Sequence, residues 1–114
     1  MKKIFLLLIL LFPLKSFAVP TEFANVIVLD KITAITQKYK MKVGEKYAVD
    51  NLDITVEKCE KTPPEDTPES AIFITIVELE NDYKELFKGW MFASNPSINS
   101  LEHAIYDVWL MSCE

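Results

Sequence analysis

Residues 71–79 read AIFITIVEL, a run in which both alternating sets of side chains are mainly apolar and several are β-branched. β-Branched side chains favour the pleated backbone of a strand. A strand that is apolar on both faces has to be covered on both faces. This run therefore predicts a central β-strand, which requires neighbouring strands on either side.

The segments around this run carry strand patterns of their own. Residues 26–36 are rich in β-branched side chains, and residues 39–43 and 52–57 alternate between apolar and polar side chains. Turn-forming residues separate the segments. The predicted strands cover residues 26–36, 39–43, 47–49, 52–57, 71–79, 83–93 and 104–112. Six or seven short strands of this kind predict an all-β fold, either a small sandwich or a barrel.

Two segments do not fit a strand. Residues 60–70 contain three prolines among acidic residues, and proline has no N–H for a sheet, so we expect an extended surface loop. The sequence Ser94-Asn95-Pro96 resembles a helix start, with Asn95 as the N-cap and Pro96 in the first turn. A short helical turn reaching about Glu102 is therefore expected.

The first 18 residues have the pattern of a secretory signal peptide. Lys2 and Lys3 precede an apolar stretch at residues 4–14, and Ser16-Phe17-Ala18 supplies the small residues that a signal peptidase reads. A retained anchor is the alternative, but the stretch is shorter than the roughly 20 residues that span a bilayer as a helix. The expected organisation is a signal peptide at residues 1–18, cleaved after Ala18, a flexible leader at 19–25 and a β domain at 26–114 in the periplasm.

The two cysteines follow from that compartment. In an oxidising environment Cys59 and Cys113 are expected to form a disulfide. The chain-entropy model assigns about 4 kcal/mol to closing such a loop. Two buried, reduced thiols are the alternative.

The charge of the chain excludes some partners. Removal of residues 1–18 takes away three of the 12 lysines and no acid, which leaves nine lysines against 17 acidic residues, a formal charge of −8; the sequence has no arginine. Such a chain is poorly suited to nucleic acid or to an anionic membrane surface. We expect peripheral membrane contact or none, and we interpret the acidity as solubility.

No motif in the sequence requires catalysis. The one histidine, His103, lies near Glu102 and Asp107, but no second histidine shares a helical face with it, as a zinc motif requires. A structural histidine at the entrance of a strand, bonded to backbone, is the favoured interpretation. No serine lies in a G-x-S-x-G motif and no C-x-x-C is present. No metal and no cofactor are expected.

Polar residues interrupt the otherwise apolar C-terminal part, and they define a candidate binding face. Its members are Trp90, Glu102, His103, Tyr106 and Asp107. The alternative is that the aromatic residues of this part fill the core, namely Trp90, Phe92, Tyr106 and Trp109. The proline-rich segment 62–68 is a possible second contact, because polyproline-like chains lose little entropy on binding.

The C-terminal motifs carry a resemblance. Residues 87–96, FKGWMFASNP, and residues 101–109, LEHAIYDVW, resemble the signatures of an exported alphaproteobacterial family of unknown function. Residues 29–34 and 52–56 extend the similarity, so that it covers residues 29–113. The resemblance implies a small envelope protein with paired cysteines, and it implies no activity.

These observations lead to one main hypothesis and two alternatives. The main hypothesis is a non-catalytic periplasmic β domain that binds another envelope component, which we expect to be a protein. The first alternative is a cell-wall-directed enzyme or carbohydrate-binding protein that uses Glu102 or Asp107 near Trp90 and Trp109. The second is a structural subunit without a discrete site. The oligomeric state is left open.

Overall fold

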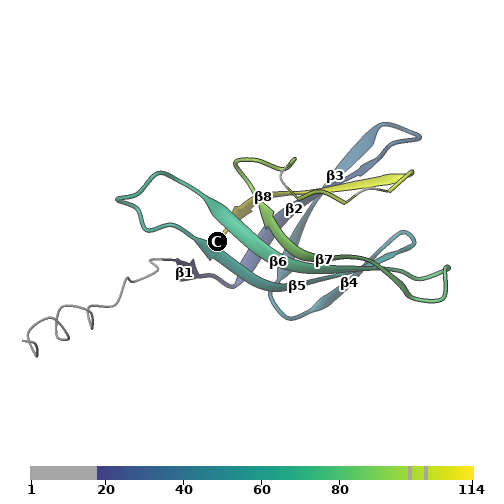
Figure 1. Cartoon of the computed structure of the whole chain (residues 1–114), viewed down its shortest axis with the longest axis horizontal. Coiled ribbons are helices and arrows are strands. Elements are labelled where there is room, and N and C mark those ends of the chain that lie inside the picture. The colour runs from purple at the N-terminus through teal and green to yellow at the C-terminus, as the bar shows by residue number, and fades with distance from the viewer. Residues whose placement is uncertain (1–17, 98, 102) are drawn as a thin grey trace, which may run out of the picture.

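The computed structural model describes residues 18–97, 99–101 and 103–114, and these form eight strands in two antiparallel sheets (Figure 1). The larger sheet has the order β1-β5-β6-β7, with β4 also paired to β5, and the smaller has the order β3-β2-β8. The strands are β1 Val19–Pro20, β2 Phe23–Asp30, β3 Ile35–Lys42, β4 Lys46–Val49, β5 Leu52–Lys61, β6 Ser70–Glu78, β7 Lys84–Phe92 and β8 Tyr106–Cys113. The expected all-β fold is confirmed, and of the two expected forms, a sandwich or a barrel, the chain has the sandwich. All of the predicted signal peptide except its last residue, Ala18, lies outside the described residues.

Strand β6 is the central strand that residues 71–79 predict, since it pairs with β5 on one side and β7 on the other. Its inward side chains, Ile72, Ile74 and Ile76, are completely buried. Complete burial of such a side chain contributes about 1.5–3 kcal/mol. The outward residues at 73, 75 and 77 are only half-buried. The apolar run is therefore explained by a core on one side and partial cover on the other.

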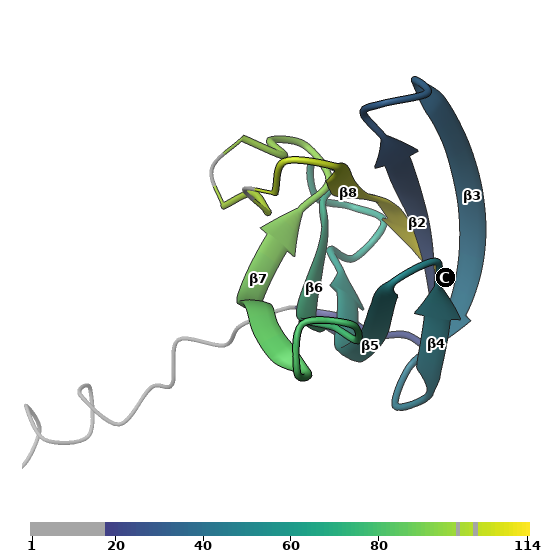
Figure 2. The same cartoon turned by 90° about the vertical axis from the view of Figure 1, so that its right-hand side faces the viewer.

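The core lies between the two sheets, as Figure 2 shows from one end of the sandwich. Val26 and Val28 of β2 and Val108 and Leu110 of β8 face the inner side of the larger sheet. A disulfide between Cys59 of β5 and Cys113 of β8 joins the sheets, with 5.7 Å between the Cα atoms. The expected pairing is confirmed, and it fixes the last strand to the opposite sheet.

The predicted strand at residues 26–36 is wrong, because the chain reverses at residues 31–34. The Asp30 carboxylate accepts hydrogen bonds from the backbone N–H groups of Ile32 and Thr33, at 2.9 and 3.2 Å. Ala34 donates to the Asp30 carbonyl at 2.8 Å and has a φ of 62°. An aspartate that bonds its own following backbone starts a turn without glycine or proline.

The predicted leader at residues 19–25 also requires a correction. Val19 and Pro20 pair with β5, and β2 begins at Phe23 instead of residue 26. Thr21 binds the Cys59 carbonyl through both its N–H and its hydroxyl. These contacts make residues 19–25 part of the sheets.

The expected helical turn at residues 95–102 is not formed by the residues that the structure describes there. The segment instead crosses from β7 in one sheet to β8 in the other. The Leu101 side chain is buried in the core, and the Asn99 amide donates to the Trp90 carbonyl at 2.8 Å. A Cβ atom on Gly89 would lie 3.2 Å from that amide nitrogen. Docking on the core and on the backbone of β7 outweighs the local preference for a helix.

The proline-rich loop is confirmed, although β5 continues to Lys61, so that the loop covers residues 62–69. Thr62 donates to the Glu69 carbonyl at 3.0 Å, and its hydroxyl donates to the Thr67 carbonyl at 2.9 Å. In the described part of the chain, no helix has the length and apolar character needed to cross a membrane.

Candidate functional site

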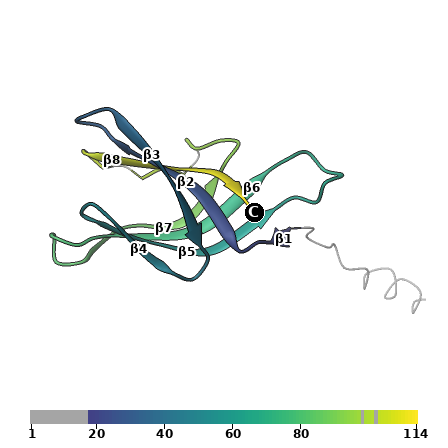
Figure 3. The same cartoon turned by 180° about the vertical axis from the view of Figure 1, so that it is seen from behind.

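The two ends of the sandwich differ in shape. Figures 1 and 3 show the β2–β3 hairpin diverging from the β4–β5 and β6–β7 hairpins at one end, whereas the loop at residues 62–69 lies at the other. The first of these is the hairpin end, formed by the turns at residues 31–34, 50–51 and 79–83. Loops carried on a rigid sandwich are common binding sites.

The divergence of the sheets leaves part of an inner face uncovered. Ile35 is the partner of Asp30 in the β2–β3 ladder, so its side chain points toward the other sheet, yet it is 57% exposed. A hollow of about 200 Å³ opens beside it. The residues that line this hollow are Val28, Asp30, Thr33, Ile35, Gln37, Tyr39, Val49 and Asp50. Its lining therefore combines apolar and polar side chains.

The turn of the same hairpin adds a second exposed apolar group. Ile32 is 75% exposed at the tip. Two large isoleucines on one projecting hairpin are costly to leave in water, because each buried aliphatic side chain gains about 1.5–3 kcal/mol. Exposed apolar groups beside a hollow are typical of a surface that is covered by a partner.

Strand β3 is an edge strand in the described structure, paired only with β2. Val43 donates to the Glu22 carbonyl at 2.8 Å, so the odd-numbered residues of β3 point their backbone groups toward β2. The even-numbered residues point theirs outward. The N–H of Lys42 is bonded by the Tyr47 hydroxyl at 2.8 Å, so the open edge covers residues 36–41.

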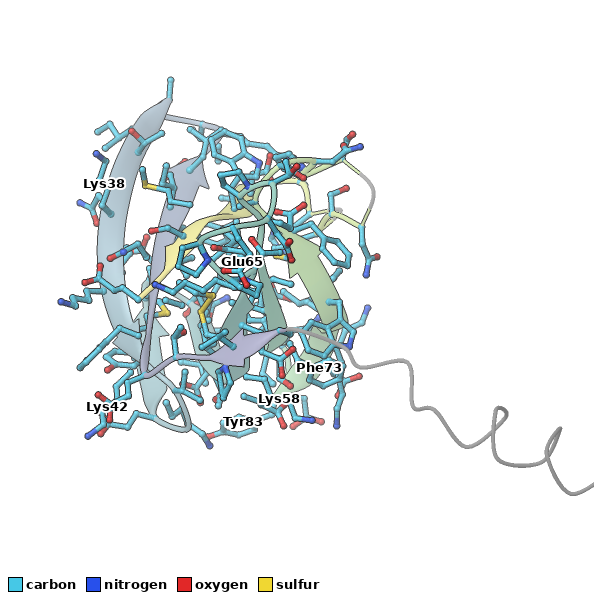
Figure 4. All side chains as sticks on the ribbon, turned by 90° about the vertical axis from the view of Figure 1, so that its left-hand side faces the viewer. Lys38, Lys42, Lys58, Glu65, Phe73 and Tyr83 are labelled. Carbon is cyan, nitrogen blue, oxygen red and sulfur yellow. A yellow bond between two sulfur atoms is a disulfide. The ribbon has the colours of Figure 1, made fainter. Side chains whose placement is uncertain are left out.

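The side chains of the even-numbered residues share the outer face of the smaller sheet. They include Lys38, Lys40 and Lys42, and Figure 4 shows Lys38 and Lys42 along the outer border of β3. The Lys40 ammonium lies 3.3 Å from a Glu114 carboxylate oxygen and 4.8 Å from the centre of the Phe23 ring. Both members of that ion pair are about half exposed, and an exposed pair is easily exchanged.

His103 holds the start of β8 in place. Its Nδ1 accepts hydrogen bonds from the N–H groups of Ile105 and Tyr106, at 3.0 and 3.3 Å, so the ring proton is on Nε2, which donates to Glu78 at 2.9 Å. The bond from His103, followed by one from Asn81, holds the pKa of Glu78 below its usual value. The expected structural histidine, bonded to backbone at a strand entrance, is confirmed.

Tyr106 lies next to this histidine, with 5.5 Å between the ring centres. Burial raises the pKa of its phenol, and the nearby carboxylates of Asp50 and Asp30 raise it further, against the effect of a backbone hydrogen bond at Asn51. The phenol therefore stays neutral at physiological pH and acts as a packing group with a polar tip.

The family of the chain follows from a comparison of sequences. A family model described as "Uncharacterized protein conserved in bacteria (DUF2155)" matches residues 24–113, which is most of the chain and all of the strands from β3 to β8.

The chain belongs to the DUF2155 family. A comparison with curated proteins also finds a relative, the "Uncharacterized protein RP359" of Rickettsia prowazekii (strain Madrid E). It is 33% identical over 99 residues, which cover 81% of this chain and 64% of the relative. The chain thus spans about two thirds of the length of that relative. No solved structure matches the chain.

The DUF2155 domain separates the residues of the predicted binding face. His103 and Tyr106 lie together at the start of β8, as described above. Trp90 lies on the outer face of the larger sheet, where its ring meets that of Phe73 edge-on at 5.5 Å. Asp107 lies on the outer face of the smaller sheet and bonds the N–H of Val108. Glu102 lies outside the described residues.

The core interpretation of the aromatic residues holds for one of the four. Tyr106 is buried, whereas Trp90, Phe92 and Trp109 are half-buried on outer faces of the DUF2155 domain. Trp109 and Asp107 line an open hollow of about 340 Å³ together with Pro96, Ser97 and Ser100. Trp90 and Trp109 thus lie on the outer faces of different sheets.

In the described ranges of the chain, no group of three or more His, Cys, Asp or Glu side chains is placed to hold a metal ion. Sequence reasoning missed the open edge of β3 and the exposed Ile35. The signal was present in residues 37–43, QKYKMKV, where lysine occupies alternate positions.

Proposed function

We propose that the domain is a non-catalytic module of the periplasm that binds another envelope protein through its hairpin end. The observation that carries this proposal is the uncovered inner face of the β2–β3 hairpin. Ile35 is more than half exposed on a face that should be core, next to a hollow and to the exposed Ile32. A partner that covered these groups would bury the apolar surface that the fold leaves in water.

The compartment is supported by two features that agree. The first 18 residues carry the signal pattern, with a basic start and an apolar stretch. The disulfide between Cys59 and Cys113 persists in oxidising compartments and is rare in the cytosol. Alkylation of the protein recovered from the envelope tests this part, and thiols found free there would contradict it.

Crosslinking in the producing cells tests the binding role. A photoreactive residue is placed at Ile35, and in a matched variant at Lys61, an exposed strand residue at the other end of the sandwich. We expect one defined adduct with an envelope protein from position 35 and none from position 61. Equal labelling from the two positions, or adducts with cytosolic proteins alone, would remove the proposal.

A second candidate function is carbohydrate binding at the hollow beside Trp109 and Asp107. The observation in its favour is a half-buried indole next to a carboxylate and two serine hydroxyls, groups suited to stacking on a sugar and bonding its hydroxyls. Hydrolysis would need a second carboxylate, and Glu102 lies outside the described residues. Binding of peptidoglycan fragments that is lost in Trp109→Ala would favour this candidate over the protein partner.

A further inference from the structure

We propose that the open edge of β3 takes up an extended peptide segment of the partner as an additional strand, with acidic side chains opposite Lys38 and Lys40. This inference rests on the proposed function, because it names the chemistry and the binding mode of the partner segment. It is carried by the backbone edge, the charges along it and the hollow beside it.

The backbone edge sets the binding mode. The N–H and C=O groups of residues 36, 38 and 40 point away from β2, and in the described structure no other strand pairs with them. An unpaired edge is a template for a further strand, which gains main-chain hydrogen bonds. Because the Tyr47 hydroxyl already occupies the N–H of Lys42, the added strand covers residues 36–41.

The charges along the edge set the chemistry of the partner. The whole chain has more acidic residues than lysines, but β3 reads ITQKYKMK, with lysine at three alternate positions and no acid. An antiparallel strand added here places its own residues opposite Lys38 and Lys40 on the outer face. Opposite charges in directly facing pairs stabilise, and like charges destabilise. The site therefore fits an acidic segment and disfavours a second copy of β3.

The hollow determines which side chains fit between the acidic residues of the added strand. Side chains alternate along a strand, so the residues between the acidic ones point to the inner side. There they meet Ile35, Gln37 and Tyr39, three residues of β3 that line the hollow. Apolar side chains at these positions would cover Ile35, which is now 57% exposed. The recognised pattern is therefore acidic and apolar residues in alternation.

A simpler interpretation of the lysines is that they prevent unwanted pairing, since charged residues on edge strands commonly do so. Protection of the edge requires charges but does not require an uncovered inner face. The hollow beside the edge is the observation that favours a ligand, and the experiment below separates the two roles.

Peptide binding to residues 19–114, the form expected after export, tests the inference. The probe is a fluorescent, capped peptide of sequence Thr-Glu-Val-Glu-Val-Glu-Thr, followed by fluorescence anisotropy. One comparison peptide has Lys in place of Glu. Another has N-methyl groups on the alternate amides that would face β3. We expect the Glu peptide to bind and each comparison peptide to bind about tenfold or more weakly.

Charge reversal provides the matched variants. Lys38→Glu with Lys40→Glu should weaken the Glu peptide by about tenfold or more and strengthen the Lys peptide. Lys84→Glu with Lys88→Glu, on β7, should leave both affinities unchanged. In hydrogen exchange, the amides of residues 36, 38 and 40 should become slow on binding, whereas those of residues 37 and 39 are slow already.

Three results would overturn the inference. These are equal binding of the Glu and Lys peptides, no effect of N-methylation, or binding of neither peptide together with dimerisation of a variant whose edge charges are removed, Lys38→Thr with Lys40→Thr. The last result assigns the lysines to protection of the edge. If the crosslinks from position 35 persist in that case, the partner-binding role stands and only strand addition fails. If the peptide binds but no crosslink forms in cells, the proposed function fails instead.

Discussion

The two ends of the sandwich differ in how firmly the sheets are joined and in how much apolar surface is exposed. At one end the Cys59–Cys113 disulfide joins the sheets, and the loop at residues 62–69 bonds its own backbone. At the hairpin end the sheets diverge, Ile32 and Ile35 are exposed, and Ala34, Asp50, Asp82 and Tyr83 all have a positive φ. Stability is therefore concentrated at one end, and exposed groups with strained turns gather at the other, where binding sites commonly lie.

The largest effect on this contrast should come from loss of the disulfide. Replacement of Cys59 and Cys113 by serine should lower the free energy of unfolding by about 4 kcal/mol in the chain-entropy model. Denaturant unfolding measures it, with the reduced native protein as the control. The first amides to lose protection should be those of Thr21, which donates to the Cys59 carbonyl, and of the end of β8, which carries Cys113. A loss below about 1 kcal/mol would contradict a clamping role.

The next largest change in stability should come from a core isoleucine, and an exposed isoleucine provides the comparison. Ile74→Ala, in the fully buried centre of β6, should cost about 3 kcal/mol, because it leaves a cavity in the core. Ile35→Ala should change stability by no more than about 0.5 kcal/mol. The same substitution at Ile35 should weaken binding of the acidic peptide. A large loss of stability from Ile35→Ala would show that this residue is part of the core.

The turn at residues 31–34 should be improved by glycine. Ala34 has a φ of 62°, a conformation that costs a residue with a Cβ atom about 1–2 kcal/mol. Ala34→Gly should therefore raise the free energy of unfolding by about 1 kcal/mol. Ala48→Gly, at an exposed position of β4 without a positive φ, should lower it by about 0.5–1 kcal/mol. Thermal unfolding of the two variants checks the opposite signs.

The smallest effect concerns acid. The folded state lowers the pKa of Glu78 from its usual value of about 4.5. The ionised carboxylate therefore stabilises the protein at a pH above 4.5, and this contribution is lost as the pH falls through the pKa that Glu78 has in the folded state. Glu78→Gln should remove that contribution. The variant should then lose less stability than the wild type between pH 5 and pH 3, as measured by urea unfolding. An identical pH dependence would show that the bond to His103 contributes nothing.

Much of the sandwich follows from local patterns in the sequence. The run at residues 71–79 became the buried strand β6, the alternation at residues 52–57 became part of β5, and the two cysteines became the disulfide. The first hairpin could not be read in the same way, because its turn contains Ile32 and Thr33, residues typical of strands. What reverses the chain there is the Asp30 carboxylate, bonded to the backbone.

The candidate site was harder to predict than the fold. The polar residues of the C-terminal motifs are close in sequence, but alternation along β8 sends Tyr106 inward and Asp107 outward, and Trp90 belongs to the other sheet. The hairpin end depends on how far two sheets diverge, which is a property of their packing. No local pattern reports it, although the alternate lysines of β3 mark the strand that borders the hollow.

The position of the disulfide along the chain has one more consequence. The bond closes a covalent ring from Cys59 to Cys113, which contains β6, β7 and β8. Strands β2, β3 and β4 lie outside the ring and are held by non-covalent contacts alone. The strands β6, β7 and β8 can therefore unfold only within a closed loop, whereas the β2–β3 hairpin is kept in place by the packing of Ala24, Val26 and Val28 in the core.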